Sequence, residues 1–176
     1  MRVAIFDFDG TLVDSDEALI APFHALGVTP PPLGLPLVAA CEMVGITVAD
    51  YRAHYDTSAV APFAGVEAML GALDRWALCS NKAKDAGVEE LARLGWSPEV
   101  ALFSDDFGLV EKTLGPVLDA LGVDVADVVY IGDTAHDRAC AAAVGATFAA
   151  AAWNPRVVPE PSDVVLRQPA DLLALL

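Results

Sequence analysis

The sequence has few of the residues that build disulfide-bonded or zinc-stabilised domains. Among 176 residues there are only three cysteines, Cys41, Cys79 and Cys140, and no Cys-x-x-Cys pair. An odd number at these spacings indicates neither a disulfide framework nor a zinc site. At this length we expect one domain with a full hydrophobic core and room for a small insertion.

Positive charge is scarce as well. The chain carries 10 Lys and Arg residues against 25 Asp and Glu residues, which gives a formal net charge of −15. This balance disfavours nucleic acid or an anionic membrane as a partner, because both are polyanions. A small anionic substrate stays compatible with it, since local charge decides binding. Lys82, Lys84 and Lys112 are the three lysines, and all fall in or near the motif segments below, which agrees with an electropositive pocket or with chance.

A long apolar run is missing too. No stretch of about 18 or more apolar residues occurs, so no membrane span is predicted. Asp7 interrupts the first apolar run, which therefore does not read as a secretory signal. We expect a cytoplasmic protein, and a hydrophobic content of 55% argues against disorder.

The most informative stretch is Val3-Ala-Ile-Phe-Asp7-Phe-Asp9-Gly-Thr-Leu-Val-Asp14-Ser15. Its apolar beginning predicts a buried parallel strand. Asp7 and Asp9 share one side of the strand end, where two carboxylates need a cation between or beside them. Hard carboxylate oxygens suit Mg²⁺, and Gly10 permits a sharp turn directly afterwards. The alternative is a strand that ends in an ordinary polar turn, because Asp and Gly are common turn residues.

Apolar strands and helical segments alternate along the rest of the chain. Strands after the first are expected at 76–79, 101–103, 128–131, 147–151 and 164–166, with helices between them and a terminal helix at 170–176. This alternation predicts an α/β fold, an open parallel sheet with helices on both faces. Residues 1–14 and 62–176 are expected to form this core.

Residues 15–61 are expected to form a small α-helical cap inserted into the core. Helices are predicted after Asp14 or Ser15, at 37–44, and from about 48 to 56, with Asp14 or Ser15 and then Thr47 as N-cap residues. Its conspicuous polar cluster is Tyr51-Arg-Ala-His-Tyr55. Arg52 or His54 could reach a substrate, although ordinary packing is the more common role of such residues.

Polar residues follow three of the predicted strands at their carboxyl ends. Asp7 and Asp9 follow the first strand, Ser80 and Asn81 follow the second, and Asp133 follows the strand at 128–131. In an open parallel sheet, ligands bind outside these ends at a topological switch point. If the three strands are neighbours with the first in the middle, these groups meet in one crevice.

The string Asp-x-Asp-Gly-Thr-Leu-Val-Asp-Ser after a buried strand resembles the first motif of the haloacid dehalogenase superfamily of aspartate-nucleophile phosphatases. The resemblance covers the core, about residues 2–10 and 63–153, and four motifs follow in the right order. It implies a Rossmann-like sheet in which the strands at 76–79 and 128–131 flank the first. The insertion is similar to the helical cap of phosphoglycolate-phosphatase-like members, but shorter.

The resemblance implies catalytic roles for three residues. Asp7 would attack phosphorus and form an aspartyl phosphate, and Asp9 would act as general acid and base. Lys112 would be the cation of the third motif, held against the phosphate and the nucleophile. The Pro that usually follows this lysine is missing, since the chain continues Thr-Leu-Gly-Pro116.

The resemblance also implies a phosphate site and a magnesium site. Ser80 would bind a phosphate oxygen with Asn81 as a further donor, and Gly10 and Thr11 belong to the same expected phosphate site. Mg²⁺ is the expected cofactor, with Asp7, Asp9, Asp133 and Asp137 as its expected ligands. Asp9 would contribute its backbone carbonyl, and Asp137 would support either the water shell of the metal or the lysine.

We therefore expect a Mg²⁺-dependent phosphatase that hydrolyses a small phosphorylated metabolite. The nearest alternative is a phosphotransferase or mutase that passes the phosphoryl group to a sugar hydroxyl. A non-catalytic phosphate-binding protein is disfavoured because no acid of the set is missing. A haloacid dehalogenase is disfavoured because that chemistry lacks the second acid and the metal, and a receiver domain has a different order of acids and lysine. The sequence does not indicate an oligomeric state.

Overall fold

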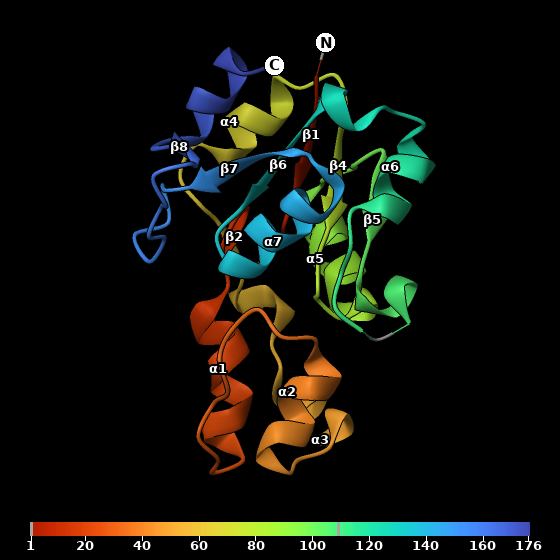
Figure 1. The fold of residues 1–176 in the computed structure, drawn as a ribbon. Helices are drawn as coiled ribbons and strands as arrows, with labels where there is room; N and C mark the ends of the chain where they lie inside the picture. Colours follow the sequence, from red (N-terminus) through yellow and green to blue (C-terminus); the bar gives the residue numbers. More distant parts are fainter. Residues whose placement is uncertain (1, 109) are drawn as a thin grey trace.

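The centre of the structure, a computed structural model describing residues 2–108 and 110–176, is a six-stranded sheet of order β5-β4-β1-β6-β7-β8 (Figure 1). Every neighbouring pair in this sheet is parallel. This confirms the predicted α/β fold, with the first strand flanked by the second and fourth. The strands are β1 (Val3–Phe6), β4 (Trp76–Cys79), β5 (Val100–Leu102), β6 (Val128–Gly132), β7 (Thr147–Ala151) and β8 (Val164–Leu166).

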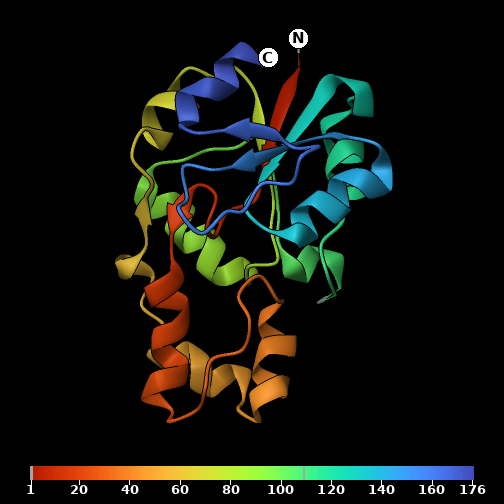
Figure 2. The same cartoon turned by 60° about the vertical axis from the view of Figure 1, so that its left-hand side comes forward.

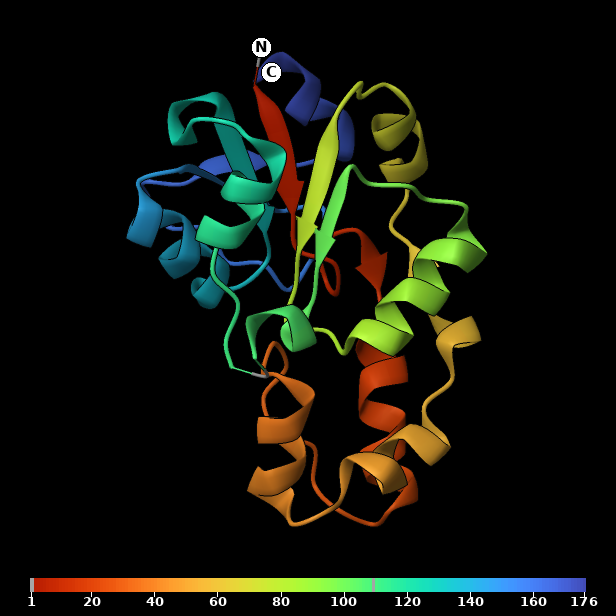
Figure 3. The same cartoon turned by 90° about the vertical axis from the view of Figure 1, so that its right-hand side faces the viewer.

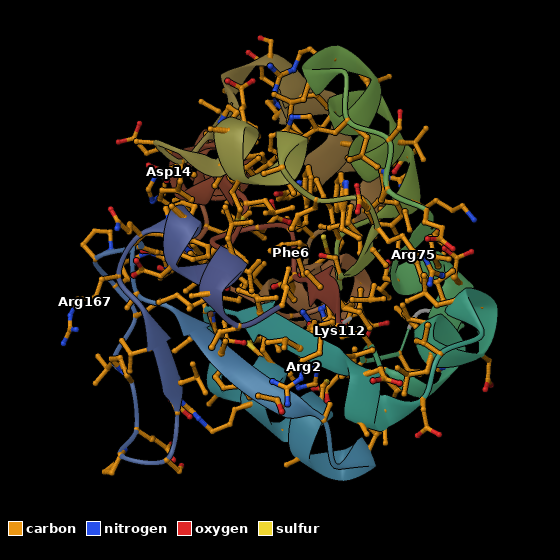
Figure 4. All side chains as sticks on the ribbon, turned by 90° about the horizontal axis from the view of Figure 1, so that it is seen from above. Arg2, Phe6, Asp14, Arg75, Lys112 and Arg167 are labelled. Carbon is orange, nitrogen blue, oxygen red and sulfur yellow. The ribbon has the colours of Figure 1, made fainter. Side chains whose placement is uncertain are left out.

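Side chains of β1 alternate between two hydrophobic cores, one on each face of the sheet. Ala4 and Phe6 belong to one core and Val3 and Ile5 to the other, and all four are buried. Phe6 accordingly lies at the centre of the molecule in Figure 4, whereas Arg167 projects from its edge. The first core is covered by α4 (Val66–Gly71), α5 (Lys84–Leu94) and the 3-10 helix η4 (Pro169–Ala174), and the second by α6 (Gly115–Leu121) and α7 (Ala135–Val144).

Residues between the first strand and α4 form a group of short helices around a small core of their own. They comprise α1 (Asp16–Ala25), α2 (Leu37–Val44), α3 (Val48–His54) and the 3-10 helix η1 (Thr57–Ala59). Phe23, Ala40, Cys41 and Tyr51 make up the buried centre of this cap. It lies beyond the carboxyl ends of the strands, opposite the two chain termini (Figures 2 and 3). A two-stranded antiparallel ribbon, β2 (Val13–Asp14) and β3 (Ala61–Pro62), connects it to the core.

Of the two side-chain caps predicted for the insertion, one is confirmed and one is wrong. Thr47 caps α3 as predicted, because its Oγ1 accepts the N–H of Asp50 at 3.0 Å. Ser15 precedes α1, but its hydroxyl makes no hydrogen bond within the described residues, and its backbone lacks the extended conformation of a capping residue. The expected side-chain cap at Asp14 or Ser15 is therefore wrong.

The helix expected at 170–176 is present with slightly different bounds. It is a 3-10 helix, η4, at Pro169–Ala174. Pro169 lies in its first turn and the N–H of Gln168 donates to the side chain of Asp171 at 3.1 Å, so the segment is held as a short capped turn. The described residues contain three further 3-10 turns. Two lie in the core, η2 (Ser104–Phe107) and η3 (Val125–Asp127), and η1 lies in the cap. Within the described residues, no helix is long and apolar enough to cross a membrane.

Gly87 marks the closest approach of α5 to the loop after β5. A Cβ atom at Gly87 would overlap the ring of Phe103, whereas one at Gly71 in α4 would meet no atom within 4 Å. Replacing a helical glycine by alanine normally favours folding by about 0.5–1 kcal/mol. We expect Gly71→Ala to keep or raise the free energy of unfolding. Gly87→Ala should lower it by about 1–3 kcal/mol, because the buried ring must move.

Chemical denaturation of the two variants beside the unchanged protein measures this difference. Equal effects of the two substitutions would mean that the contact with Phe103 does not limit position 87.

Candidate active site

Asp7 lies where β1 ends, and a lysine holds it there. Its Oδ1 accepts the N–H of Phe8 at 2.7 Å and lies 2.9 Å from Nζ of Lys112. The same Nζ lies 2.6 Å from Oδ1 of Asp137. Lys112 therefore bridges two carboxylates, and all three side chains are buried. Figure 4 shows Lys112 in the interior of the molecule.

The backbone around Lys112 is fixed without the proline that the resemblance led us to expect. Its N–H donates to Oδ1 of Asn81 at 2.8 Å, and its carbonyl accepts the thiol of Cys140 at 3.2 Å. Although burial lowers it, the negative charges of Asp137 and Asp7 raise the pKa of Lys112 above its usual value. The two carboxylates thus favour the charged form of this lysine.

Both carboxylate oxygens of Asp137, in the first turn of α7, have several polar partners. Its Oδ1 accepts the hydroxyl of Tyr130 at 2.9 Å in addition to facing Lys112. Its Oδ2 accepts the N–H and the hydroxyl of Thr134 at 2.9 and 2.6 Å, and the N–H of Asp133 at 3.2 Å. Burial alone would raise its pKa, but Lys112 and these hydrogen bonds lower it. Of its two expected roles, these contacts favour support of the lysine, and direct metal binding stays a prediction.

Asp133 approaches the turn after β1 closely. Its Oδ1 accepts the hydroxyl of Thr11 at 3.2 Å. Gly10 has a positive φ of 76°, and a Cβ atom there would overlap the carboxylate of Asp133. A side chain at position 10 would therefore push Asp133 out of the site.

The three carboxylates together fit a divalent cation. Asp7, Asp133 and Asp137 offer oxygens that lie within 4.8 Å of one another. Burial raises the pKa of Asp133 to about 8, and the charges of Asp7 and Asp137 add to this effect. Burial likewise raises the pKa of Asp7 to about 6, even though Lys112 opposes it. One lysine thus leaves an excess of negative charge on oxygen ligands, which is the donor set that Mg²⁺ prefers.

Asp9 belongs to a separate set of contacts. Both of its carboxylate oxygens accept from Nζ of Lys82, at 2.9 and 3.2 Å. Lys82 follows Asn81 directly after β4, and Glu90 on α5 lies 3.0 Å from the same Nζ. The two neighbouring acids of the first motif are therefore held by two different lysines.

The expected phosphate-binding residues lie beside Asp7, but most of their polar groups have partners. Asn81 donates its side-chain amide to the carbonyl of Gly34 in the cap at 2.9 Å. The N–H groups of Gly10 and Thr11 donate within their own turn, to the carbonyls of Val13 and Phe8. The Ser80 hydroxyl, in contrast, accepts from the N–H of Lys82 at 3.3 Å and donates to no group among residues 2–108 and 110–176, so its O–H can donate to a ligand. Phosphate binding by these four residues stays a prediction.

A pocket of about 560 Å³ lies between the core and the cap. Arg52 lines it and pairs with Asp85 on α5 at 2.6 Å, whereas His54 does not line it and instead contacts the carbonyl of Asp50. Lys84 does not line it either and pairs with Asp106 at 2.5 Å, so for this lysine the structure favours chance as the explanation of its position. The cap contributes mostly apolar side chains to the lining, together with the polar Asp16, Arg52 and Thr57, whereas the core contributes mostly polar ones. The apolar cap residues include Leu19, Phe23, Leu35 and Leu37, and the polar core residues include Asp7, Asp9, Ser80, Lys82 and Asp133.

Comparison with known proteins decides the family. The sequence profile of the family described as "Haloacid dehalogenase-like hydrolase" matches residues 37–151, more than half of the chain. This range includes Ser80, Lys112 and Asp133, and the Asp7 motif precedes it. The chain belongs to the haloacid dehalogenase-like hydrolase family. It is therefore a hydrolase, as the sequence predicted.

Individual members of the family and their structures agree over the whole chain. A "Phosphoglycolate phosphatase" of Xanthomonas campestris is 28% identical over 211 aligned positions, which cover 97% of this chain and 94% of the relative. Since 211 exceeds the 176 residues here, part of that relative has no counterpart in this chain.

Two solved structures share the fold. A haloacid dehalogenase-like hydrolase of Streptococcus pneumoniae has a TM-score of 0.74 at 20% identity, covering 99% of this chain and 98% of its own. A "HAD phosphatase" of Thermococcus onnurineus has a TM-score of 0.71 at 14% identity, covering 99% and 97%. The fold of this hydrolase is therefore that of the family.

Several residues of the site were not predicted from the sequence. Trp153 donates its indole N–H to the carbonyl of Thr11 at 2.8 Å, and Asn154 donates to the carbonyl of Gly10 at 2.7 Å. Arg156 pairs with Asp16 at 2.5 Å and reaches within 3.9 Å of Asp133. No sequence signal links these residues to the first motif and α1, because 140 or more positions separate them from Thr11, Gly10 and Asp16. For Lys82, its place directly after the second motif was the available signal.

The raised pKa values of Asp7 and Asp133 predict how metal-free stability depends on pH. A carboxyl group with a raised folded-state pKa stabilises most below its unfolded pKa, and the contribution is lost as pH rises through the folded value. For Asp7 and Asp133 these folded values are about 6 and 8. We therefore expect the Tm of the metal-free hydrolase to fall between pH 5.5 and 8.5. Added Mg²⁺ should raise Tm more at pH 8.5, where both groups are ionised.

Thermal melts with Mg²⁺ and with chelator at the two pH values measure this effect, and Asp133→Asn is the control. That variant should lose most of the Mg²⁺ response. An Mg²⁺ response that is equal at both pH values, or that persists in Asp133→Asn, would contradict the assignment of these carboxylates to one metal site.

Proposed function

We propose that this hydrolase removes phosphate from a small phosphomonoester in a Mg²⁺-dependent reaction, with Asp7 as the nucleophile. The position of Asp7 carries the proposal. Its Oδ1 is held by Phe8 and Lys112, and within the described part of the chain its Oδ2 accepts no hydrogen bond. Asp7 also lines the pocket. A carboxylate fixed through one oxygen leaves the other free to attack a phosphorus atom in the pocket.

The reaction takes two displacements at phosphorus. In the first, Oδ2 of Asp7 forms a bond to phosphorus while the ester oxygen leaves and takes the proton of Asp9, which enters this step as the neutral carboxylic acid. In the second, Asp9 accepts a proton from water, the water oxygen bonds to phosphorus, and the bond to Asp7 breaks. Free phosphate leaves and both carboxyl groups return to their starting states. Asp9 thus acts as acid and then as base, as its contact with the pocket allows.

Lys112 and Ser80 support the phosphoryl group in this proposal. Lys112 places a fixed positive charge beside Asp7, and the Ser80 O–H is a donor free for a phosphate oxygen. Asp7, Asp133 and the backbone carbonyl of Asp9 would hold Mg²⁺, which when bound neutralises charge on the phosphate oxygens. Gly10 and Thr11 shape the turn that brings Asp133 to this site.

The volume and lining of the pocket indicate which substrates to test. The name of the Xanthomonas relative makes 2-phosphoglycolate a first compound to test. The pocket, about 560 Å³, falls within the range of roughly 300–1,000 Å³ that accommodates drug-sized ligands. Its mostly apolar lining on the cap side also favours a larger organic group than a two-carbon acid. A small cap excludes less water, so hydrolysis is favoured over transfer to a sugar.

A panel of phosphomonoesters assayed for phosphate release tests the proposed activity. The panel should contain 2-phosphoglycolate, sugar phosphates and an aryl phosphate, each with Mg²⁺ and with chelator. We expect Mg²⁺-dependent release of phosphate from at least one of them. Release that is unaffected by chelator would contradict the metal assignment, and transfer to a sugar without free phosphate would favour a phosphotransferase.

Substitution of the two acids of the first motif tests their different roles. Asp7→Asn should abolish turnover, because an amide is a very poor nucleophile. Asp9→Asn keeps the nucleophile but removes proton transfer, which is typically worth about 10²–10⁴-fold in rate. With an aryl phosphate, whose leaving group needs no proton, phosphoenzyme should accumulate in Asp9→Asn. Mass spectrometry after an acid quench should find the adduct on the Asp7 peptide, and an adduct elsewhere would refute the mechanism.

A further inference from the structure

A second buried cluster of charges lies next to the nucleophile site and involves Asp9. Its centre is Lys82, whose side chain is 3% exposed. Nζ of Lys82 contacts both oxygens of Asp9, Oε2 of Glu90 at 3.0 Å, and the hydroxyl of Tyr55 at 3.0 Å. The hydroxyl of Tyr55 in turn donates to Oε1 of Glu90 at 2.6 Å. Attack by Asp7 requires none of these three side chains.

Burying such a cluster is costly unless the charges are paired closely. Glu90 is fully buried, and desolvation raises its pKa even though Lys82 opposes this. A buried ion pair is often no more stable than apolar side chains of the same size, so stability alone is a weak reason for it. The geometry offers a second reason for burying this cluster. The ammonium group of Lys82 contacts both oxygens of Asp9 and thereby fixes the orientation of that carboxyl group.

The cluster joins the cap to the core. Tyr55 directly follows α3 in the cap, whereas Lys82 and Glu90 belong to the core, on the loop after β4 and on α5. The ring of Tyr55 stacks on Tyr51, a member of the cap core, with centroids 5.8 Å apart and planes at 19°. In Figure 3, α5 runs alongside the cap, and it packs against η1. The position of the Tyr55 hydroxyl therefore follows the position of the cap.

The direct contacts of the nucleophile come from the core. Phe8 and Lys112 contact Asp7, and Asp137 holds Lys112. The cap reaches this set at one remove, because Asn81 accepts the N–H of Lys112 and donates to the carbonyl of Gly34. Asp9 differs, because its own partner Lys82 donates to a cap hydroxyl, that of Tyr55. The two acids of the first motif thus have different lysines and different routes to the cap.

We propose that Tyr55, Lys82 and Glu90 form a positioning triad that fixes the carboxylate of Asp9 when the cap is docked. The triad couples cap docking to proton transfer, and within the described residues it makes no hydrogen bond or ion pair with Asp7. This inference rests on the proposed role of Asp9 as general acid and base. Loss of the Tyr55 hydroxyl should slow the steps that Asp9 performs and spare the attack by Asp7.

Tyr55→Phe tests the triad, because it removes one hydroxyl and keeps the ring that stacks on Tyr51. The matched control is Arg93→Met, which removes another cap–core hydrogen bond from the same helix, donated to the carbonyl of Val60 at 2.5 Å. Arg93 does not line the pocket. Both variants are compared with the unchanged enzyme by Tm, by steady-state kinetics and by acid-quenched phosphoenzyme.

For Tyr55→Phe we expect kcat with an alkyl phosphate to fall about tenfold or more, a part of the full general acid–base effect, while KM changes little. With an activated aryl phosphate, formation of phosphoenzyme should stay near the unchanged rate and its breakdown should slow. Phosphoenzyme should therefore accumulate on Asp7. Arg93→Met should show neither effect. Lys82→Arg keeps the charge, and it should retain more activity than Lys82→Met. In both Lys82 variants, breakdown of the phosphoenzyme should slow more than its formation.

Equal losses in Tyr55→Phe and Arg93→Met would mean that the triad only docks the cap, and the proposal would fall. A change confined to KM would assign Tyr55 to substrate binding, which also contradicts it. If the Tm of Tyr55→Phe lies far below that of the unchanged protein, the comparison of the two Lys82 variants decides instead. Equal activity of Lys82→Arg and Lys82→Met would then contradict the proposal. Absence of an Asp7 adduct in every variant and in the unchanged enzyme would refute the proposed function itself, and is thereby distinguished from failure of the triad.

Discussion

The buried bridge from Lys112 to Asp7 and Asp137 is the interaction on which the site depends. A lysine with almost no exposure must face carboxylates, and removal of one partner would leave an uncompensated charge, which typically costs about 3–5 kcal/mol. The remaining contacts of Asp137, with Tyr130 and Thr134, follow from the same constraint, because a buried carboxylate needs donors on both oxygens. The nucleophile is thus positioned by a network that begins in the sheet and ends in the first turn of α7.

Lysines are scarce in this acidic chain, and most of them lie at the site. Of the three lysines, Lys82 and Lys112 are buried at the site and each faces two carboxylates, whereas Lys84 lies outside. Each buried lysine serves one acid of the first motif. Neighbouring carboxylates that share a strand end can therefore have separate supports and separate chemistry. Mg²⁺ is the additional positive charge that Asp7 and Asp133 still need in our proposal.

Much of the fold was predictable because it follows from local patterns. Apolar runs such as Val3–Phe6 and Val128–Ile131 predicted buried strands, and polar residues after them predicted the edge at which the site lies. The approach of Lys112 to Asp7 was implied only by the family resemblance. Neither periodicity nor spacing encodes how distant segments meet. Three features depend on it: the missing side-chain N-cap at Ser15, the position of Lys84, and the Asn81–Gly34 contact. The same is true of Tyr55, whose partners lie in other elements.

The central claim is that hydrolysis proceeds through a covalent phosphoryl group on Asp7. The stereochemical course at phosphorus tests it most directly, with a phosphorothioate monoester whose phosphorus carries sulfur, ¹⁶O and ¹⁸O in a known configuration, hydrolysed in water labelled with ¹⁷O. Each in-line displacement inverts the configuration at phosphorus. Two displacements, at Asp7 and then by water, predict overall retention. Overall inversion would show a single attack by water and would contradict the account.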